Sequence, residues 1–587
     1  MSRLGAFCGQ VLEAGWLAII VVAPVYFNVY TSRVFEPDKA TLLRNLSVAL
    51  AVVWLLWWLE ARAASGANAA PLGKRLRAAT QANPLLLPAA LVLAANVLAN
   101  LFSVVPQISL WGSYLRLQGL LTTLCYLLVF AVIAAHMRRE EQAQRFVTVG
   151  ILVSVPVGLY GMMQRFRLDP LLWGQDVSQR VTSSLGNPIF LSAFMLLVTP
   201  LVVARLAQAV AALRTAPARP LAVEGPEVAR LAGLVLAQNA GLFLVAKLTA
   251  PGNAHFWAYT PMLGFFLLLL PFIRAPQPGK LLVGAQIVGY SLVLLVHLVT
   301  AVLSQSRGPW LGLLAGVALV VLVLAVRGAP RVVRVGLFAM VLAALLALVG
   351  MNVPGTPLEG LKHIPQVGRL ANLGETETGS GRVRLLVWRA SAELLGERPP
   401  AGPAPDGFSA LRPLVGYGPE SFYFTFTKVF PPELWLWEGY SSTPDRAHNE
   451  IIDQLAMQGA LGLLSWLLVM HVGLLLALRM LGLVPAGRLW PLLVLLTGVF
   501  GVGLAVVRGL LRGGRGGATM PLERYVLIVG LLAALVGHFV EVQIGIAIVA
   551  TRTYAWAMLG VLAALWQMEQ QPHPTPDVAT ASAAAAP

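Results

Sequence analysis

The sequence predicts an all-α membrane protein, a polytopic bundle of transmembrane helices with one large loop on its outer side. Of the 587 residues, 57% are hydrophobic and only 12% are charged, whereas soluble domains carry about 25% charged residues. The apolar residues form long stretches, and about 20 residues of helix cross a bilayer core. Helices are required because the lipid core offers no water to satisfy exposed backbone groups. The stretch that departs from this pattern is 352–449.

Apolar stretches follow one another along the chain and predict about 14 spans. Residues 1–10 run into the first stretch without a small-residue cleavage site, so we expect an uncleaved anchor. Late in the chain we expect helices at 451–478 and 489–507, and over 525–566 either one span with a re-entrant piece or two short spans. The predicted regions are N-terminal transmembrane helices at 1–351, a large loop at 352–449, C-terminal transmembrane helices at 450–567, and a disordered tail at 568–587.

The basic residues predict the orientation. A net charge of +16 could indicate nucleic-acid binding, but these residues gather in short loops at 62–77, 138–145, 205–230 and 327–334. That distribution follows the positive-inside rule for cytoplasmic loops, so we expect a membrane-lipid environment and no nucleic-acid partner. Arg508, Arg512 and Arg515 conflict with the rule if 489–507 crosses the membrane. The remaining loops would face outward: 31–39, 103–119, 165–186, 251–260, 304–308 and 352–449.

The long loop, residues 352–449, has the composition of a folded segment. It is rich in Gly and Pro, and its aromatic residues argue against disorder. Residues 381–397 predict an amphipathic helix that places several apolar side chains on one face. Residues 399–413 are rich in Pro and Gly and predict irregular structure. The apolar face of the predicted helix consists of Val383, Leu386, Val387, Ala390 and Leu394.

Two residues at the outer interface are candidates for chemistry. Arg307 follows a long apolar span; it could be an interfacial anchor beside Trp310, or a guanidinium that binds phosphate through its bidentate fork. His448 lies where the long loop re-enters the membrane. It could be an ordinary loop or capping residue, or a general base next to the positive end of a helix dipole.

Two further arginines precede turns in outward segments. Arg180 lies before Gly186-Asn187-Pro188, and Arg116 lies in a segment that ends at Gly119. Each could be an interfacial anchor or part of a binding loop. No closely spaced cluster of His, Asp and Glu with metal-ligand spacing occurs in an outward loop, so a metal-dependent reaction is disfavoured.

The residues around Arg307 and His448 resemble two motifs of the O-antigen ligase family. Arg307 and Leu311 fit its Arg-x3-Leu motif. His448-Asn449, followed after nine residues by Gly459 and then Gly462, fits its second motif, which lies after the large loop in that family. The resemblance extends from about Lys39 to Trp566. The superfamily includes O-antigen polymerases and bacterial protein O-glycosyltransferases. Smaller similarities surround Arg116, Arg180 and Gly416-Tyr417-Gly418.

The resemblance implies a GT-C-like bundle in the bacterial inner membrane that transfers a glycan on the periplasmic face. The donor would be undecaprenyl diphosphate-linked, and the acceptor a hydroxyl of lipid A-core or another lipid or glycan. Neither metal, ATP nor another cofactor is implied. Arg307 would bind the diphosphate and His448 would act as a general base, so that direct attack inverts the anomeric centre. The implied substrate-binding residues are Arg180, Arg382, Arg384, Arg116 and Asn449.

Three other functions remain open. An O-antigen or exopolysaccharide polymerase and a protein O-oligosaccharyltransferase would use the same chemistry with a different acceptor. A polysaccharide transporter would place substrate groups at mid-membrane on paired broken helices of two related halves. The sequence has no such halves, and its candidate residues gather at the outer interface.

Overall fold

The computed structural model describes residues 2–570 except 65–70, 170, 172, 174, 354, 364–378, 401–405, 440–441, 486, 514–519 and most of 219–277. Across the described residues the secondary structure is helical and contains no strand. The predicted all-α fold class is therefore confirmed. The predicted outward loop at 251–260 and the part of the predicted tail from 571 onward lie outside the described residues.

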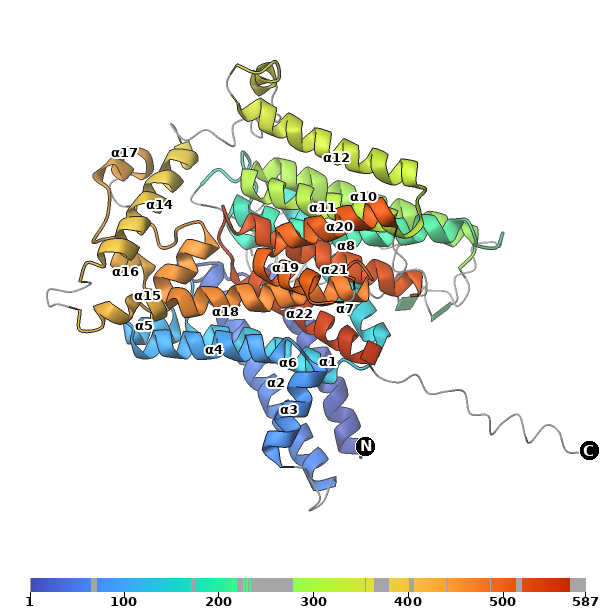
Figure 1. The fold of residues 1–587 in the computed structure, drawn as a ribbon, viewed down its shortest axis with the longest axis horizontal. Coiled ribbons are helices and arrows are strands. Elements are labelled where there is room, and N and C mark those ends of the chain that lie inside the picture. The colour runs from blue at the N-terminus through green and yellow to red at the C-terminus, as the bar shows by residue number, and fades with distance from the viewer. Residues whose placement is uncertain are drawn as a thin grey trace, which may run out of the picture.

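The helices that precede the long loop pack side by side and make up much of the bundle (Figure 1). Local sequence determines where they begin. Asn187, for example, accepts a hydrogen bond from the backbone N–H of Ile189 (2.8 Å), and Pro188 takes the first helical position, where a backbone N–H is not needed. These helices are α1 (Arg3–Val25), α2 (Glu36–Ala64), α3 (Leu72–Ala82), α4 (Leu86–Leu101), α5 (Pro106–Trp111), α6 (Leu120–His136), α7 (Glu140–Arg165), α8 (Pro188–Leu213), α10 (Lys280–Ser304), α11 (Arg307–Gly328) and α12 (Arg331–Asn352).

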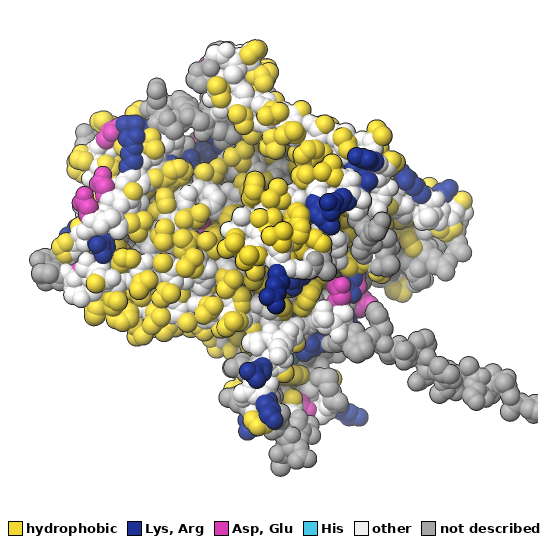
Figure 2. Space-filling model, viewed as in Figure 1, with side chains coloured by type: hydrophobic (Ala, Val, Ile, Leu, Met, Phe, Trp, Pro, Cys, Tyr) yellow, Lys and Arg dark blue, Asp and Glu magenta, His cyan; other side chains and the backbone are white. Residues whose placement is uncertain are grey.

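The bundle has the surface of a membrane protein. Within the described residues, nine helices are long and apolar enough to cross a membrane, and α4 and α6 are shorter apolar helices. Hydrophobic side chains cover the flank of the bundle in Figure 2, while Lys and Arg gather toward its ends. On α12, for instance, Val332 and Leu346 are exposed. A polytopic helical bundle is confirmed, and the total of about 14 spans stays a prediction.

The C-terminal region begins with the long helix α18 (Glu450–Met480) and ends with α21 (Leu522–Glu541) and α22 (Val549–Gln570). The stretch 525–566 thus forms two helices rather than one span with a re-entrant piece. Between α18 and α21, Gly498 adopts a left-handed φ of 54° and separates α19 (Leu489–Thr497) from α20 (Val499–Arg512). At 9 and 14 residues, these two helices are too short to span a bilayer core individually.

The α19–α20 pair returns to the end of the bundle from which it starts. Arg508 donates to the carbonyl of Leu483, just after α18 (3.4 Å), and Arg334 donates to the carbonyl of Gly509 (3.4 Å). The single helix expected at 489–507 is therefore wrong, because the stretch forms two short helices that turn back on each other. The conflict with the charge rule disappears for Arg508, because it lies at the same end as Arg334. We call this end, which also carries Arg327 in the last turn of α11, the basic end.

The long loop folds against the opposite end of the bundle, which we call the loop end (Figure 1). The predicted amphipathic helix is confirmed as α14 (Gly379–Glu397), which buries all five residues of its predicted apolar face. The stretch 399–413 is mostly irregular where it is described, but it contains a 3-10 turn, and Arg412 begins a short helix. The other short elements are η4 (Glu359–His363), η5 (Ser409–Leu411), α15 (Arg412–Val415), α16 (Phe422–Phe426), η6 (Pro432–Leu434) and α17 (Trp435–Glu438).

A kink in α18 attaches the loop to the bundle. Gly459 has a left-handed φ of 66°, and the N–H groups of Tyr417 and Gly418 donate to the freed carbonyls of Ala456 and Met457 (2.9 and 2.8 Å). A Cβ on Gly459 would lie 2.3 Å from the backbone of the 414–415 segment. Only glycine tolerates both this φ and this approach. The glycine of the His-Asn motif is thus a docking point for the loop.

Candidate functional site

Arg307 is the first residue of α11, directly after a break in the chain's helical path. The break occurs at Gln305, whose backbone is left-handed (φ 53°). Trp310 is buried, and its indole N–H donates across the break to the carbonyl of Ala301 (2.8 Å). Trp310 therefore holds α10 and α11 together at the break. The guanidinium of Arg307 therefore extends from a fixed backbone position.

Arg180 lies at the same break. Its Nε donates to the carbonyl of Ser304 (3.3 Å), the last residue of α10. Arg180 reaches this position from the segment that leads through Ser183, which has a left-handed φ of 51°, into α8. The structure therefore brings Arg180 beside the start of α11, although 127 residues separate it from Arg307.

The two predicted arginines of α14 have different environments. Arg382 forms an ion pair with Glu433 (2.9 and 2.5 Å). Arg384 has a buried Nε that finds no hydrogen-bond partner in the described part of the chain. Burial lowers the pKa of Arg384, the positive charge of Arg307 lowers it further, and Glu438 partly offsets both effects. Arg384 therefore lies within electrostatic range of Arg307.

His448 is held in an uncommon backbone conformation, with a φ of 55°. Its neighbour Ala447 is fixed on both sides, since its N–H donates to Asp453 and its carbonyl accepts from the indole of Trp388 on α14 (2.8 Å each). As far as the chain is described, Nδ1 of His448 is buried without a hydrogen-bond partner. A left-handed non-glycine residue of this kind is common at functional sites.

Asn449 caps α18. Its side-chain oxygen accepts from the N–H of Ile452 (3.1 Å), and its amide donates to the carbonyl of Gln543 (3.0 Å). Both ends of the side chain are therefore engaged in holding the start of α18 against the α21–α22 connection. This placement keeps the N-terminus of α18, with its partial positive charge, next to His448.

The pKa of His448 is lowered to about 4. Burial is the main cause, the positive charges of Arg384 and Arg116 add to it, and the negative charge of Asp445 opposes it. His448 is therefore neutral at neutral pH and can accept a proton. The same interactions place it within electrostatic range of Arg384 and of the Arg116–Asp445 pair.

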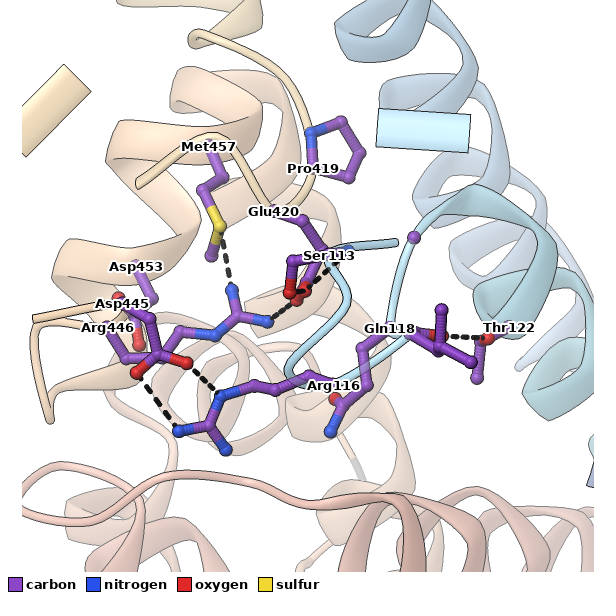
Figure 3. A network of polar contacts seen from close by, with 12 residues as sticks. Ser113, Arg116, Gln118, Thr122, Pro419, Glu420, Asp445, Arg446, Asp453 and Met457 are labelled. Atoms are coloured by element: carbon purple, nitrogen blue, oxygen red, sulfur yellow. Dashed lines mark hydrogen bonds and ion pairs between the residues drawn. The ribbon is translucent and has the colours of Figure 1, made fainter. Parts of the chain in front are cut away.

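Arg116 belongs to a network of polar contacts that links two outward segments (Figure 3). Its guanidinium binds Asp445 through Nε and Nη2 (2.5 and 3.1 Å). Beside it, Arg446 pairs with Glu420, which also accepts from Ser113 (2.5 Å). Burial raises the pKa of Asp445, but Arg116 more than reverses this and brings it to about 2. The pair is ionised, and it holds the end of the long loop three residues before His448.

Sequence reasoning missed the acidic members of this network and the indole that holds Ala447. Asp445 and Arg116 are 329 residues apart in the sequence, and Glu420 and Ser113 are 307 residues apart. No motif or spacing in the sequence connects them. The sequence identifies Trp388 as an aromatic residue of the loop, but it does not indicate the contact that the indole makes.

The fold and the site define a class: a polytopic membrane protein with arginines and a neutral histidine at one end, suited to an anionic substrate and proton removal. Residues 291–467 match a family model described as O-antigen ligase. The predicted family is thereby confirmed for this segment, and the chain carries an O-antigen ligase domain, which supports a membrane glycosyltransferase of the O-antigen ligase or polymerase type. The matched segment contains Arg307, Arg384 and His448. No curated protein matches the chain.

Proposed function

We propose that this protein transfers a glycan from undecaprenyl diphosphate to an acceptor hydroxyl on the periplasmic face of the bacterial inner membrane. The observation that carries the proposal is the convergence of Arg307, Arg384 and His448 at the loop end. These residues come from α11, α14 and the segment before α18, which are far apart in the sequence. All three lie inside the part of the chain that matches the O-antigen ligase model.

The distribution of basic residues supports the orientation. Arg307 begins α11 at the loop end, and Arg327 lies in the last turn of the same helix at the basic end. Arg334 and Arg508 lie near Arg327, at the end where α12 begins and α20 finishes. Since cytoplasmic ends of membrane proteins carry an excess of Lys and Arg, the basic end would face the cytoplasm. The loop end, with the candidate site, would face the periplasm.

The cationic side of the site suits the donor diphosphate. Arg384 is buried next to the positive charge of Arg307, an arrangement that costs free energy unless an anion offsets it. Arg180, beside the start of α11, adds a third guanidinium. Guanidinium groups bind phosphate oxygens in a bidentate manner. A diphosphate held here would have its negative charge stabilised as the bond to the sugar breaks.

His448 would remove the proton of the acceptor hydroxyl. The acceptor oxygen forms a bond to the anomeric carbon of the donor sugar, and the bond from that carbon to the diphosphate oxygen breaks. The electron pair leaves with undecaprenyl diphosphate, and the hydroxyl proton passes to His448. Direct attack opposite the leaving group inverts the anomeric centre. Since no proton has to be added to the diphosphate, one base suffices.

Donor binding would also strengthen the base. The positive charge of Arg384 lowers the pKa of His448 in the protein alone. A diphosphate at Arg384 would offset that charge, so the pKa of His448 would rise toward its ordinary range near 6.5. A base whose pKa lies closer to neutral pH accepts a proton more effectively. The histidine would thus be weakly basic until the donor is present.

A reconstituted transfer reaction tests the proposal. Purified protein in liposomes receives undecaprenyl diphosphate-linked glycan and a panel of acceptors: lipid A-core, a second donor-linked repeat unit, and protein. The wild type is expected to form a glycosidic bond and release undecaprenyl diphosphate, and the acceptor that is used separates ligase, polymerase and protein glycosylation.

Two variants test the residues. His448→Gln should reduce transfer by about 10²–10⁴-fold, the usual contribution of a general base, and Arg307→Ala by about 10²–10³-fold. His136→Gln is the matched control, because His136 ends α6 away from these residues. Near-normal transfer by His448→Gln would remove that residue from the mechanism, and product with the donor's anomeric configuration would contradict direct attack.

A further inference from the structure

A surface cavity of about 450 Å³ lies next to the candidate site. Four segments form its walls: the connection from α1 to α2, the segment around Arg116, the start of α8, and the end of the long loop. Its polar lining includes Arg33, Glu36, Asn187 and Asp445. Sites for small ligands commonly have volumes of about 300–1,000 Å³. The donor-side residues Arg307 and Arg384 are not among those that line the cavity.

Glu36 gives this cavity an unmatched polar group. The residue is only 6% exposed. One carboxylate oxygen accepts from the backbone N–H of Val549 (3.0 Å) and from the side chain of Gln118 (3.3 Å). The other oxygen, Oε1, finds no hydrogen-bond partner among the described residues. A buried carboxyl oxygen without a donor is costly, and a ligand hydroxyl that reached Oε1 would provide that donor.

The charges of the cavity differ from those of the donor side. Two arginines, Arg33 and Arg116, are accompanied in the lining by two acidic side chains, Glu36 and Asp445. A mixed lining of this kind gives a diphosphate little net attraction, whereas carboxylates, guanidinium groups and amides all hydrogen-bond to hydroxyls. Phe190 adds an apolar surface beneath Arg116, whose guanidinium carbon lies 5.8 Å from the ring centroid. The chemistry fits an uncharged, hydroxyl-rich sugar.

The Arg116–Asp445 pair connects the cavity to the candidate base, although His448 is not among the residues that line the cavity. Its wall contains the Arg116–Asp445 ion pair, and Asp445 precedes His448 by three residues. Charges of both members act on His448. His448 therefore lies within electrostatic range of two groups: the Arg116–Asp445 pair in the cavity wall, and Arg384 on the donor side.

Exposed aromatic residues indicate that the cavity lies at the level of the membrane surface. Tyr30, Trp111 and Tyr114 are 77%, 53% and 67% exposed, and such residues are enriched at membrane–water interfaces. Tyr114 hydrogen-bonds Ser32 and stacks with Arg33, both of which line the cavity. A sugar attached to a lipid in the same leaflet could reach this position.

We propose that this cavity binds the sugar of the acceptor and presents its hydroxyl to His448. The inference rests on the proposed function and adds to it the place and chemical class of the acceptor: an uncharged sugar bound between Glu36 and the Arg116–Asp445 pair. Donor and acceptor would then occupy separate sites, the diphosphate at Arg307 and Arg384 and the acceptor sugar in the cavity.

The test fills the cavity without changing the donor side. Thr443 lines the cavity, and Thr443→Trp would occupy part of it. Thr427→Trp is the matched control on an exposed position of the same loop. With the acceptor that supports transfer by the wild type, Thr443→Trp should raise the acceptor KM at least tenfold. The donor KM and the slow hydrolysis of donor in the absence of acceptor should stay at wild-type values, which also shows that the variant is folded.

A second variant tests the carboxylate itself. Glu36→Gln keeps one oxygen for the Val549 N–H but replaces the unpartnered Oε1 with an amide nitrogen, which cannot accept a hydrogen bond from a ligand hydroxyl, and it should also raise the acceptor KM and leave donor hydrolysis unchanged. An unchanged acceptor KM in Thr443→Trp would overturn the cavity assignment while the proposed function stands. A raised donor KM in Thr443→Trp would instead place the donor's glycan in the cavity, and it would also overturn the assignment of the cavity to the acceptor. A wild type that neither transfers nor hydrolyses donor would contradict the proposed function itself.

Discussion

Two regions at the loop end use arginine in opposite ways. Arg116 and Arg446 each bind a carboxylate, Asp445 and Glu420, and together they tie the end of the long loop to the segment before α6. Arg384, by contrast, lies against the positive charge of Arg307. The first region pairs its arginines with carboxylates, whereas in the second the buried Nε of Arg384 has no hydrogen-bond partner among the described residues and the charge of Arg384 acts on His448.

The difference shows how one residue type serves structure in one place and a substrate in another. Arg382 and Arg384 illustrate it within a single helix, since Arg382 binds Glu433 and Arg384 is directed to the cationic region. A buried guanidinium beside another positive charge costs free energy that the fold must supply. An anionic donor would offset that cost, whereas the paired arginines hold the surrounding loop in place.

The largest expected effect comes from breaking the paired region. Arg446→Met leaves the buried carboxylate of Glu420 without its counter-charge, and should lower the free energy of unfolding by about 3–5 kcal/mol. Arg446→Met combined with Glu420→Gln should recover much of this loss, because neither member of the pair is then left as an unpaired buried charge. Unfolding of the purified protein in detergent measures both. Equal stability of the single variant and the wild type would contradict the structural role of the pair.

Breaking the cationic region should instead affect activity. Arg384→Ala is expected to reduce transfer by about 10²–10³-fold, the usual effect of removing one preorganised charge donor, with little loss of stability. Arg382→Ala is the control on the same helix. It removes a partly exposed ion pair, which typically contributes about 0.2–1 kcal/mol, and transfer should stay near the wild-type rate. Equal losses of transfer activity in the two variants would contradict the different roles assigned to Arg384 and Arg382.

The pH dependence of transfer gives the smallest and most specific effect. His448 must be neutral to accept a proton, so activity falls as the pH drops through its pKa. With that pKa lowered to about 4, kcat/KM should persist down to about pH 4. Arg384→Gln removes a positive charge, which raises the pKa of His448, so the acidic limb should move to higher pH. Arg382→Gln should leave the acidic limb in place. An acidic limb that does not move in Arg384→Gln would contradict the effect of Arg384 on the pKa of His448.

Much of the fold was predictable because membrane helices are determined locally. Long apolar stretches and basic loops identified the polytopic bundle, and the apolar spacing of residues 383–394 identified α14. The helix pair at 489–512 was not predicted, because a single left-handed glycine, Gly498, divides a continuous apolar stretch. Hydropathy alone does not detect such a break.

The candidate site was predictable only in part. Arg307 and His448 lie in recognisable motifs, and the motif glycine Gly459 proves to hold the kink that docks the loop. Which loop arginine accompanies them depends on tertiary contacts. Arg382 is occupied by Glu433, 51 residues away, and no local pattern gives that pairing. The same holds for Arg116, whose partner Asp445 lies 329 residues further along the chain.

The most direct measurement is an experimental structure of the protein with an undecaprenyl diphosphate-linked glycan bound. We expect the diphosphate within hydrogen-bonding distance of the guanidinium groups of Arg307 and Arg384, with the anomeric carbon facing His448 and the Glu36 cavity left to the acceptor. A diphosphate bound at the Arg116–Asp445 and Arg446–Glu420 pairs, or at the basic end, would contradict the proposed division between donor and acceptor sites.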